Sequence, residues 1–215
     1  MLVACWSAKG GSGTTVVASS LALLLAQRDP LGSLLVDVAG DVPLALGLAE
    51  PTGPGLAGWL AAGPDVPADG LHRIEAPAEH GLAVLPRGDG PLDPARVDAL
   101  AALLVSDARP VVVDCGTLQE EVGRSLAAAA TRSVLVTRPC FLALRRALAA
   151  PIRPSEVVLL AEPGRSLGPA DVEDCLGVPV SAAVAVDPAV ARAVDAGLLG
   201  LRLPRRLSRE LSRAA

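Results

Sequence analysis

Lysine is almost absent from this 215-residue chain. Lys9 is the single lysine among 19 lysine and arginine residues. Asparagine and tyrosine do not occur, and aromatic residues make up 1% of the sequence although hydrophobic residues make up 51%. The core therefore has to be built from alanine, leucine and valine, which suits a sheet covered by helices. A lysine that stands alone among arginines directs attention to its position.

Features of zinc-binding, disulfide-bonded, secreted and membrane-spanning proteins are missing as well. The four cysteines show no Cys-x-x-Cys spacing and the two histidines lie apart from them; these residues are Cys5, Cys115, Cys140, Cys175, His72 and His80. We expect reduced thiols, and neither a zinc site nor a disulfide framework. No basic segment precedes the first apolar run, as it would in a signal peptide, and no apolar run is long enough to span a membrane. A cytoplasmic protein is expected, with peripheral association at a membrane or the nucleoid left open.

The chain is long enough to bury about 70% of its unfolded surface, so one domain over residues 1–215 is predicted. Short Val/Leu-rich runs alternate with longer Ala/Leu/Arg segments of helical period, which is typical of a doubly wound parallel sheet. The predicted strands are 2–6, 33–38, 82–85, 110–114, 133–137, 156–160 and 178–184. The predicted helices are 15–27, 93–106, 120–130, 141–149, 169–176 and 188–196, with Asp93 and Asp187 as N-caps before prolines. The predicted fold is α/β, with three layers and a mostly parallel sheet of about seven strands. Residues 50–70, rich in Gly, Pro and Asp, are expected to leave the sheet.

Lys9 lies in a glycine-rich loop between an apolar run and a helical run. The loop reads Ala8-Lys9-Gly10-Gly11-Ser12-Gly13-Thr14-Thr15. In a strand, glycine loop, helix unit, backbone N–H groups and the positive end of the helix dipole converge on one point, and glycines let the backbone approach a phosphate there. Residues 10–15 are therefore candidates for phosphate binding. The alternatives are that Lys9 is a solvated surface lysine and that the glycines serve only the turn.

Thr15 and Asp114 are candidate ligands of Mg²⁺. Thr15 stands at the start of the helix, where a hydroxyl binds the ion in phosphate-binding loops. Asp114 ends the apolar strand Val111-Val112-Val113-Asp114, and a carboxylate in that place holds the Mg²⁺ shell. Taken alone, Asp114 also fits a turn residue at the end of a strand.

These segments resemble the MinD/ParA family of deviant Walker A ATPases, and the resemblance covers essentially the whole chain. The family loop reads Lys-Gly-Gly-x-Gly-Lys-Thr, and residues 9–15 are similar to it at six of the seven places. Leu34-Leu35-Val36-Asp37 resembles the carboxylate motif of the second strand. Residues 81–86, 111–115, 133–139 and 176–179 resemble later segments of the family in the same order.

The resemblance implies a P-loop protein that binds ATP with Mg²⁺ and dimerises face to face around two nucleotides. Lys9 matches the signature lysine that reaches the partner's phosphates, and Asp37 matches the second-strand carboxylate, taken here as catalytic. Residues 10–15 match the nucleotide-binding loop, and Thr15 with Asp114 match the Mg²⁺ ligands. In the family, ATP favours the dimer and hydrolysis releases it. The resemblance thus implies a factor that positions septa, chromosomes, plasmids or pilus machinery by cycling on a membrane or DNA.

Three departures from the family pattern fall on the ATP site. The second loop lysine, which contacts phosphates within its own subunit, is Thr14 here, and losing a charged donor to a phosphate costs about 1.5 to 3 kcal/mol. Ala39 stands where the family carries an acidic residue that orients the attacking water, and nearby Asp41 is expected to point elsewhere. The adenine-reading asparagine is missing from Leu159-Leu160-Ala161-Glu162.

The hypothesis from these departures is a degenerate ATPase that binds nucleotide weakly, hydrolyses it slowly or never, and recruits a partner complex of the pilus or secretion, division or partition machinery. One alternative is an active ATPase in which Lys9 replaces the missing lysine and Asp41 the missing carboxylate. A second alternative is a nucleotide-free scaffold with the same fold. A homodimer is expected.

The C-terminal segment 201–215 is basic, in contrast to the rest of the chain. It holds five arginines and one glutamate; the arginines are Arg202, Arg205, Arg206, Arg209 and Arg213. As a helix it would place leucines on one side and most of these arginines on the other. Such a helix fits contact with an anionic membrane or with nucleic acid phosphates. The alternative is a last helix that packs its leucines on the sheet.

Overall fold

The computed structural model describes residues 1–49, 51–63 and 70–215. Its centre is one sheet in the order β3-β4-β2-β5-β1-β6-β7-β8, in which all neighbours pair in parallel except β3 and β4. The strands are β1 Leu2–Trp6, β2 Ser33–Asp37, β3 Ala76–Pro77, β4 Leu82–Leu85, β5 Val111–Asp114, β6 Arg132–Thr137, β7 Glu156–Ala161 and β8 Val180–Ala185. The chain is thus an α/β protein with a mostly parallel, doubly wound sheet.

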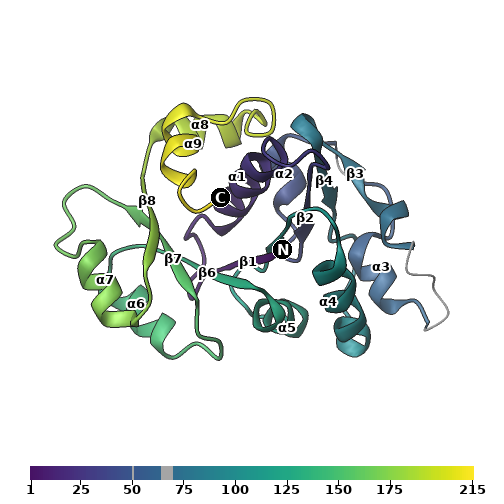
Figure 1. Cartoon of the computed structure of the whole chain (residues 1–215), viewed down its shortest axis with the longest axis horizontal. Coiled ribbons are helices and arrows are strands. Elements are labelled where there is room, and N and C mark those ends of the chain that lie inside the picture. The colour runs from purple at the N-terminus through teal and green to yellow at the C-terminus, as the bar shows by residue number, and fades with distance from the viewer. Residues whose placement is uncertain (50, 64–69) are drawn as a thin grey trace.

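Helices cover both faces of this sheet and form three layers (Figure 1). One face carries α1 Thr14–Ala26, α2 Val42–Leu46, α8 Pro188–Asp195 and α9 Arg205–Leu211. The other carries α3 Gly55–Ala61, α4 Val97–Ser106, α5 Glu121–Ala129, α6 Phe141–Leu148 and α7 Pro169–Leu176. Helix α1 is apolar almost all round because it lies between the sheet and its neighbours α2 and α9. Both faces are packed with Leu, Val and Ala, as the composition predicts.

Most predicted elements are confirmed to within two residues at their ends, apart from α4. The predicted helix 93–106 is a short 3₁₀ turn, Pro94–Arg96, followed by α4. Asp93 and Asp187 are confirmed as N-caps, because their carboxylates accept from the N–H of Ala95 at 2.9 Å and of Ala189 at 2.8 Å. The sequence analysis missed β3, α2 and α3. Helix α3 lies in the stretch 50–70 that was expected to leave the sheet, of which residues 50 and 64–69 lie outside the described part.

The C-terminal segment forms a shorter helix than the predicted span 201–215. Helix α9 covers Arg205–Leu211, and its leucines pack on the sheet: Leu207 is 3% and Leu211 0% exposed. Arg28 holds the following residues by donating to the carbonyl oxygens of Ser212 at 3.1 Å and Ala215 at 2.8 Å. The apolar side of the helix is therefore part of the core.

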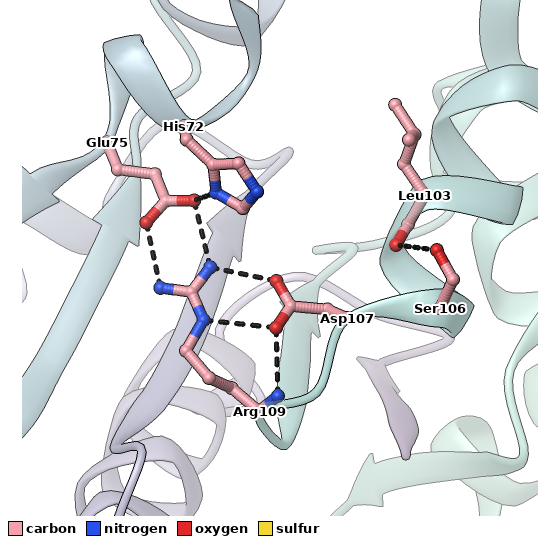
Figure 2. Close-up of polar contacts among 6 residues, drawn as sticks. All are labelled: His72, Glu75, Leu103, Ser106, Asp107 and Arg109. Atoms are coloured by element: carbon pink, nitrogen blue, oxygen red, sulfur yellow. Dashed lines mark hydrogen bonds and ion pairs between the residues drawn. The ribbon is translucent and has the colours of Figure 1, made fainter. Parts of the chain in front are cut away.

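A cluster of charges joins β3 to the start of β5 at the amino end of the sheet (Figure 2). Arg109 lies between two carboxylates and donates to Glu75 at 2.9 Å from both terminal nitrogens, and to Asp107 at 2.8 Å. His72 contacts the same Glu75 at 2.8 Å. Burial acts to raise the pKa of Asp107, but the hydrogen bonds from Arg109 outweigh it and lower that pKa.

None of the helices in the described part of the chain is long and apolar enough to cross a membrane.

Candidate functional site

The glycine loop connects the carboxyl end of β1 to the amino end of α1. Gly11 at φ 72° and Gly13 at φ 77° adopt left-handed conformations, which glycine tolerates without strain. Ser12 closes the turn by donating its hydroxyl to the carbonyl oxygen of Lys9 at 2.7 Å. Gly13 precedes α1 and supplies no side-chain cap, and the first turn has no acidic residue. Backbone N–H groups at this helix end are therefore suited to an anion.

Thr15 and Asp114, the two predicted Mg²⁺ ligands, are in contact. The Thr15 hydroxyl donates to Oδ2 of Asp114 at 2.6 Å, and the N–H of Gly116 donates to Oδ1 at 3.1 Å. Asp114 is 0% exposed, and burial raises its pKa despite both hydrogen bonds. A buried carboxylate next to a hydroxyl is a set of hard oxygen donors, which fits Mg²⁺.

Asp37 lies beside Asp114, because the two residues are register partners on β2 and β5. Its oxygens accept from the N–H groups of Gly40 at 2.6 Å and Val42 at 3.2 Å, so Asp37 holds the turn that leads into α2. Burial is the main cause that raises its pKa, to about 7. The nearby charge of Asp114 also raises this pKa, whereas the hydrogen bonds from the two N–H groups lower it. The site thus has two adjacent buried carboxylates and an excess of negative charge, which favours a bound cation.

A cavity of about 490 Å³ opens above these carboxylates. Its volume is within the range of pockets that bind small molecules. The predicted residues Gly10, Gly11, Ser12, Gly13, Thr14 and Thr15 all line it. Ser7 and Val16 flank the glycine loop in the lining, and the other walls come from the loops after β2, β4 and β5, namely Val38, Ala39, Asp41, Arg87 and residues 115–117, 119 and 120. Asp37 and Asp114 lie behind this lining, and Lys9 is exposed outside it. Asp41, expected to point elsewhere, lines the cavity too.

Arg87 and Glu120 are cavity residues that the sequence analysis missed. Arg87 follows β4 and Glu120 precedes α5, and the two form an ion pair at 3.2 Å. The signal was available, because ligands of parallel sheets bind at the carboxyl ends of the strands and Arg87 follows such an end.

A smaller, mostly apolar cavity of about 250 Å³ lies on the other side of Gly13. It is lined by Val16, Val17, Leu160, Val184, Val186 and Val190 among others. Arg138 lies at its edge, donating to the carbonyl oxygen of Gly11 at 3.0 Å and pairing with Glu162. Glu162, next to the position of the missing asparagine, is thereby bound to Arg138. The apolar walls suit a flat, uncharged group such as a base.

Comparisons with solved structures establish the fold. A ParA family ATPase from Chlorobium tepidum matches with a TM-score of 0.80 and 21% identity, over 98% of this chain and 95% of that chain. The septum site-determining protein MinD from Pyrococcus horikoshii, complexed with Mg-ADP, matches with a TM-score of 0.79 and 20% identity, over 99% of this chain and 93% of that chain. A cell division ATPase MinD from Pyrococcus furiosus matches with a TM-score of 0.76 and 22% identity, over 100% of this chain and 99% of that chain. No protein-family model and no curated protein matches the chain. The chain therefore has the fold of the ParA and MinD ATPases.

Proposed function

We propose that the chain is a MinD/ParA-like nucleotide-binding positioning factor with a degenerate ATP site, which recruits a partner complex of the division, partition, pilus or secretion machinery. The cavity under the glycine loop carries the proposal. It has the glycine backbone and the Thr15 and Asp114 pair that hold Mg²⁺ and phosphates, but Thr14 instead of a lysine on its wall. A septum site-determining protein and a putative plasmid partition protein share the fold, which supports a positioning role.

Each residue of the site has a defined part in this proposal. Gly10, Gly11 and Gly13 leave the backbone open to phosphate oxygens, and Thr15 with Asp114 holds Mg²⁺, which neutralises phosphate charge when bound. Asp37 shapes the neighbouring turn and adds negative charge next to the ion. Because Thr14 brings no charge, we expect weak binding of Mg-ATP and slow or no hydrolysis.

Titration of the chain with Mg-ATP in a calorimeter tests the proposal. We expect weak, saturable binding by the wild type and ten- to a hundred-fold tighter binding by Thr14→Lys, since the substitution adds a charged donor to the cavity wall. Thr14→Met, which has a long side chain without charge, is the matched control and is expected to bind like the wild type. No saturation by the wild type and by Thr14→Lys would favour a nucleotide-free scaffold.

The proposal includes a homodimer in which Lys9 acts on the partner's nucleotide. Lys9 is exposed and lies outside the cavity lining of its own subunit, which supports a role across an interface. Light scattering with Mg-ATP is expected to show a dimer for the wild type and a monomer for Lys9→Ala.

The second candidate function is an active ATPase, favoured by the position of Asp41 on the cavity wall. Phosphate release by the wild type and by Asp41→Asn separates the candidates. A rate near background in both supports the degenerate site. A measurable rate that Asp41→Asn abolishes supports the ATPase.

The C-terminal arginines extend the proposal to a contact with phosphates of a membrane or DNA. Arg202, Arg205 and Arg206 line, with Arg192 of α8, a hollow of about 470 Å³ on the surface. Co-sedimentation with anionic vesicles and with DNA tests this contact. The double variant Arg202→Ala and Arg205→Ala is expected to bind less than the wild type, and unchanged binding would remove these arginines from the proposal.

A further inference from the structure

Arg87 joins the three loops that border the cavity on the side of β2, β4 and β5. It follows β4, and its Nη1 donates to the carbonyl oxygen of Val38, which follows β2. Its Nη2 donates to Oε1 of Glu120 at 3.2 Å, at the start of α5. Gly40 leaves room for its stem, because a Cβ there would lie 3.2 Å from Cδ of Arg87. One side chain therefore spans the carboxyl ends of three adjacent strands.

Arg87 is the one cationic side chain in the lining of this cavity, as far as the described residues go. The other charged residues of the lining are Asp41 and Glu120, and the buried carboxylates of Asp37 and Asp114 lie behind them. A phosphate chain that enters this cavity meets negative charge on several sides. Besides a metal ion and the backbone N–H groups of the glycine loop, Arg87 is the group of the described lining that can balance that charge.

The contacts of Arg87 leave it able to bind an anion. A guanidinium has five N–H donors, and the contacts to Val38 and Glu120 account for two of them. The side chain of Arg87 is 20% exposed, whereas that of Glu120 is 47% exposed. An ion pair with so exposed a partner contributes little to stability, so replacing Glu120 by a phosphate is not opposed by the fold. The planar guanidinium also matches phosphate oxygens in a two-point contact.

We propose that Arg87 binds the polyphosphate chain within its own subunit, in place of the lysine that is absent at position 14, and gives up Glu120 as it does so. The inference rests on the proposed nucleotide-binding function and assigns the cation of that site. It also links ligand binding to a change of contacts at the start of α5. The exchange frees Glu120, the residue before α5, while Arg87 stays attached to the loop after β2.

Calorimetric titration with Mg-ATP and, separately, with Mg-pyrophosphate tests the assignment. Arg87→Ala is expected to weaken both ligands about ten-fold or more, because a charge-assisted contact to phosphate is lost. Arg87→Lys is expected to lose less, since it keeps the charge but not the two-point geometry. Arg145→Ala, which removes an exposed arginine of α6 outside the cavity, is the control and is expected to bind like the wild type.

Glu120→Gln separates anion binding from a merely structural tie between the loops. If Arg87 binds phosphate, this variant binds Mg-ATP a few-fold more tightly, because the neutral amide holds the guanidinium less strongly than the carboxylate and a negative charge is removed. If Arg87 only ties the loops, both Glu120→Gln and Arg87→Ala weaken binding and lower the melting temperature without ligand, which would overturn the inference. Equal affinity of Arg87→Ala and the wild type would overturn it as well, with the nucleotide-binding function intact. Absence of binding by the wild type and by Thr14→Lys would remove both proposals.

Discussion

At the level of single residues, buried carboxylates determine the charge beneath the glycine loop. Asp37 and Asp114 are both 0% exposed and are partners on adjacent strands. The pKa of each is raised, first by burial and, for Asp37, also by the charge of Asp114. The protein without a cation therefore holds negative charge that the fold does not favour, and a divalent cation is the natural compensation.

Asp37 gives the stability of the ligand-free protein a defined pH dependence. Its pKa is about 7 in the folded chain, above the ordinary value of 3.8, so the folded state binds more protons than the unfolded state between these values. Stability is then present at low pH and is lost as the pH rises through about 7. From pH 5 to pH 8, urea unfolding is expected to show an Asp37-linked loss of up to about 3 kcal/mol.

Asp37→Asn isolates this contribution, because an amide does not titrate. Its free energy of unfolding is expected to fall less from pH 5 to pH 8 than that of the wild type. Asp41→Asn changes an exposed carboxylate of the same loop, and its charge is the last and smallest of the causes that raise the pKa of Asp37, so this variant is expected to keep most of the wild-type dependence. The same slope in Asp37→Asn and the wild type would contradict the raised pKa.

At the level of elements, long-range polar contacts hold segments that hydrophobic packing alone leaves loosely placed. Strand β3 has two residues, Ala76 and Pro77, neither of which is buried, and it pairs only with β4 among the described strands. The cluster of Glu75, Arg109 and Asp107 ties the residue before β3 to the loop that leads into β5 (Figure 2). This contact explains how so short an edge strand keeps its place.

Arg109→Ala is expected to destabilise the chain by about 3 kcal/mol at pH 7, because two largely buried carboxylates lose the guanidinium that they share. The pKa of Asp107 is lowered in the folded state, so its share of the stability is present above its unfolded pKa and is lost as the pH falls through the folded one. The cost of Arg109→Ala is thus expected to shrink in acid. Urea unfolding at pH 7 and at pH 3, which is below the unfolded pKa of Asp107, measures both effects.

Arg165→Ala is the control for this prediction. Arg165 also pairs with a carboxylate, that of Glu162 at 2.6 Å, but its side chain is 47% exposed. Removing it is expected to cost about 1 kcal/mol or less. Equal costs for the two arginines would show that the cluster at Arg109 does not stabilise β3.

Sequence reasoning located strands and long helices well and short elements poorly. Most of the parallel strands are continuous Val/Leu-rich runs, and the 3₁₀ turn before α4 and helix α8 begin at Asp-Pro pairs whose caps are visible in the sequence. Helices α2 and α3 have five and seven residues, too few for a helical period to be recognised. Strand β3 contains Pro77 and is formed only through its pairing with β4.

At the level of the whole molecule, the last helix closes the layer that covers α1 and β8. Leu207 and Leu211 of α9 belong to the same apolar cluster as Val17 and Leu21 of α1. A membrane contact that used these leucines would have to remove them from the core, whereas a contact through the exposed arginines leaves the core intact. The fold therefore favours the arginines as the surface for any anionic partner.

Leu211→Ala is expected to cost about 2 to 5 kcal/mol in the free energy of unfolding, because it removes a side chain that is 0% exposed and leaves a cavity. Leu201→Ala, at a site that is 55% exposed, is the matched control and is expected to change stability by about 0.5 kcal/mol or less. Urea unfolding measures both. Similar, small effects of the two substitutions would mean that α9 does not remain packed on the sheet in solution.

The sequence by itself determined the order of the longer strands and helices along the chain, the glycine loop and the uncharged residue at position 14, because these depend on local pattern and on residue identity. Only the tertiary structure decided which distant residues share the site. Arg87 meets Val38 across 49 positions and Glu120 across 33. Burial of Asp37, which raises its pKa, and packing of the leucines of α9 were decided in the same way. The physical reason is that the order of strands in a parallel sheet sets which residues are close, and the helices that cover the sheet set which residues are buried. No single segment of the sequence contains either kind of information.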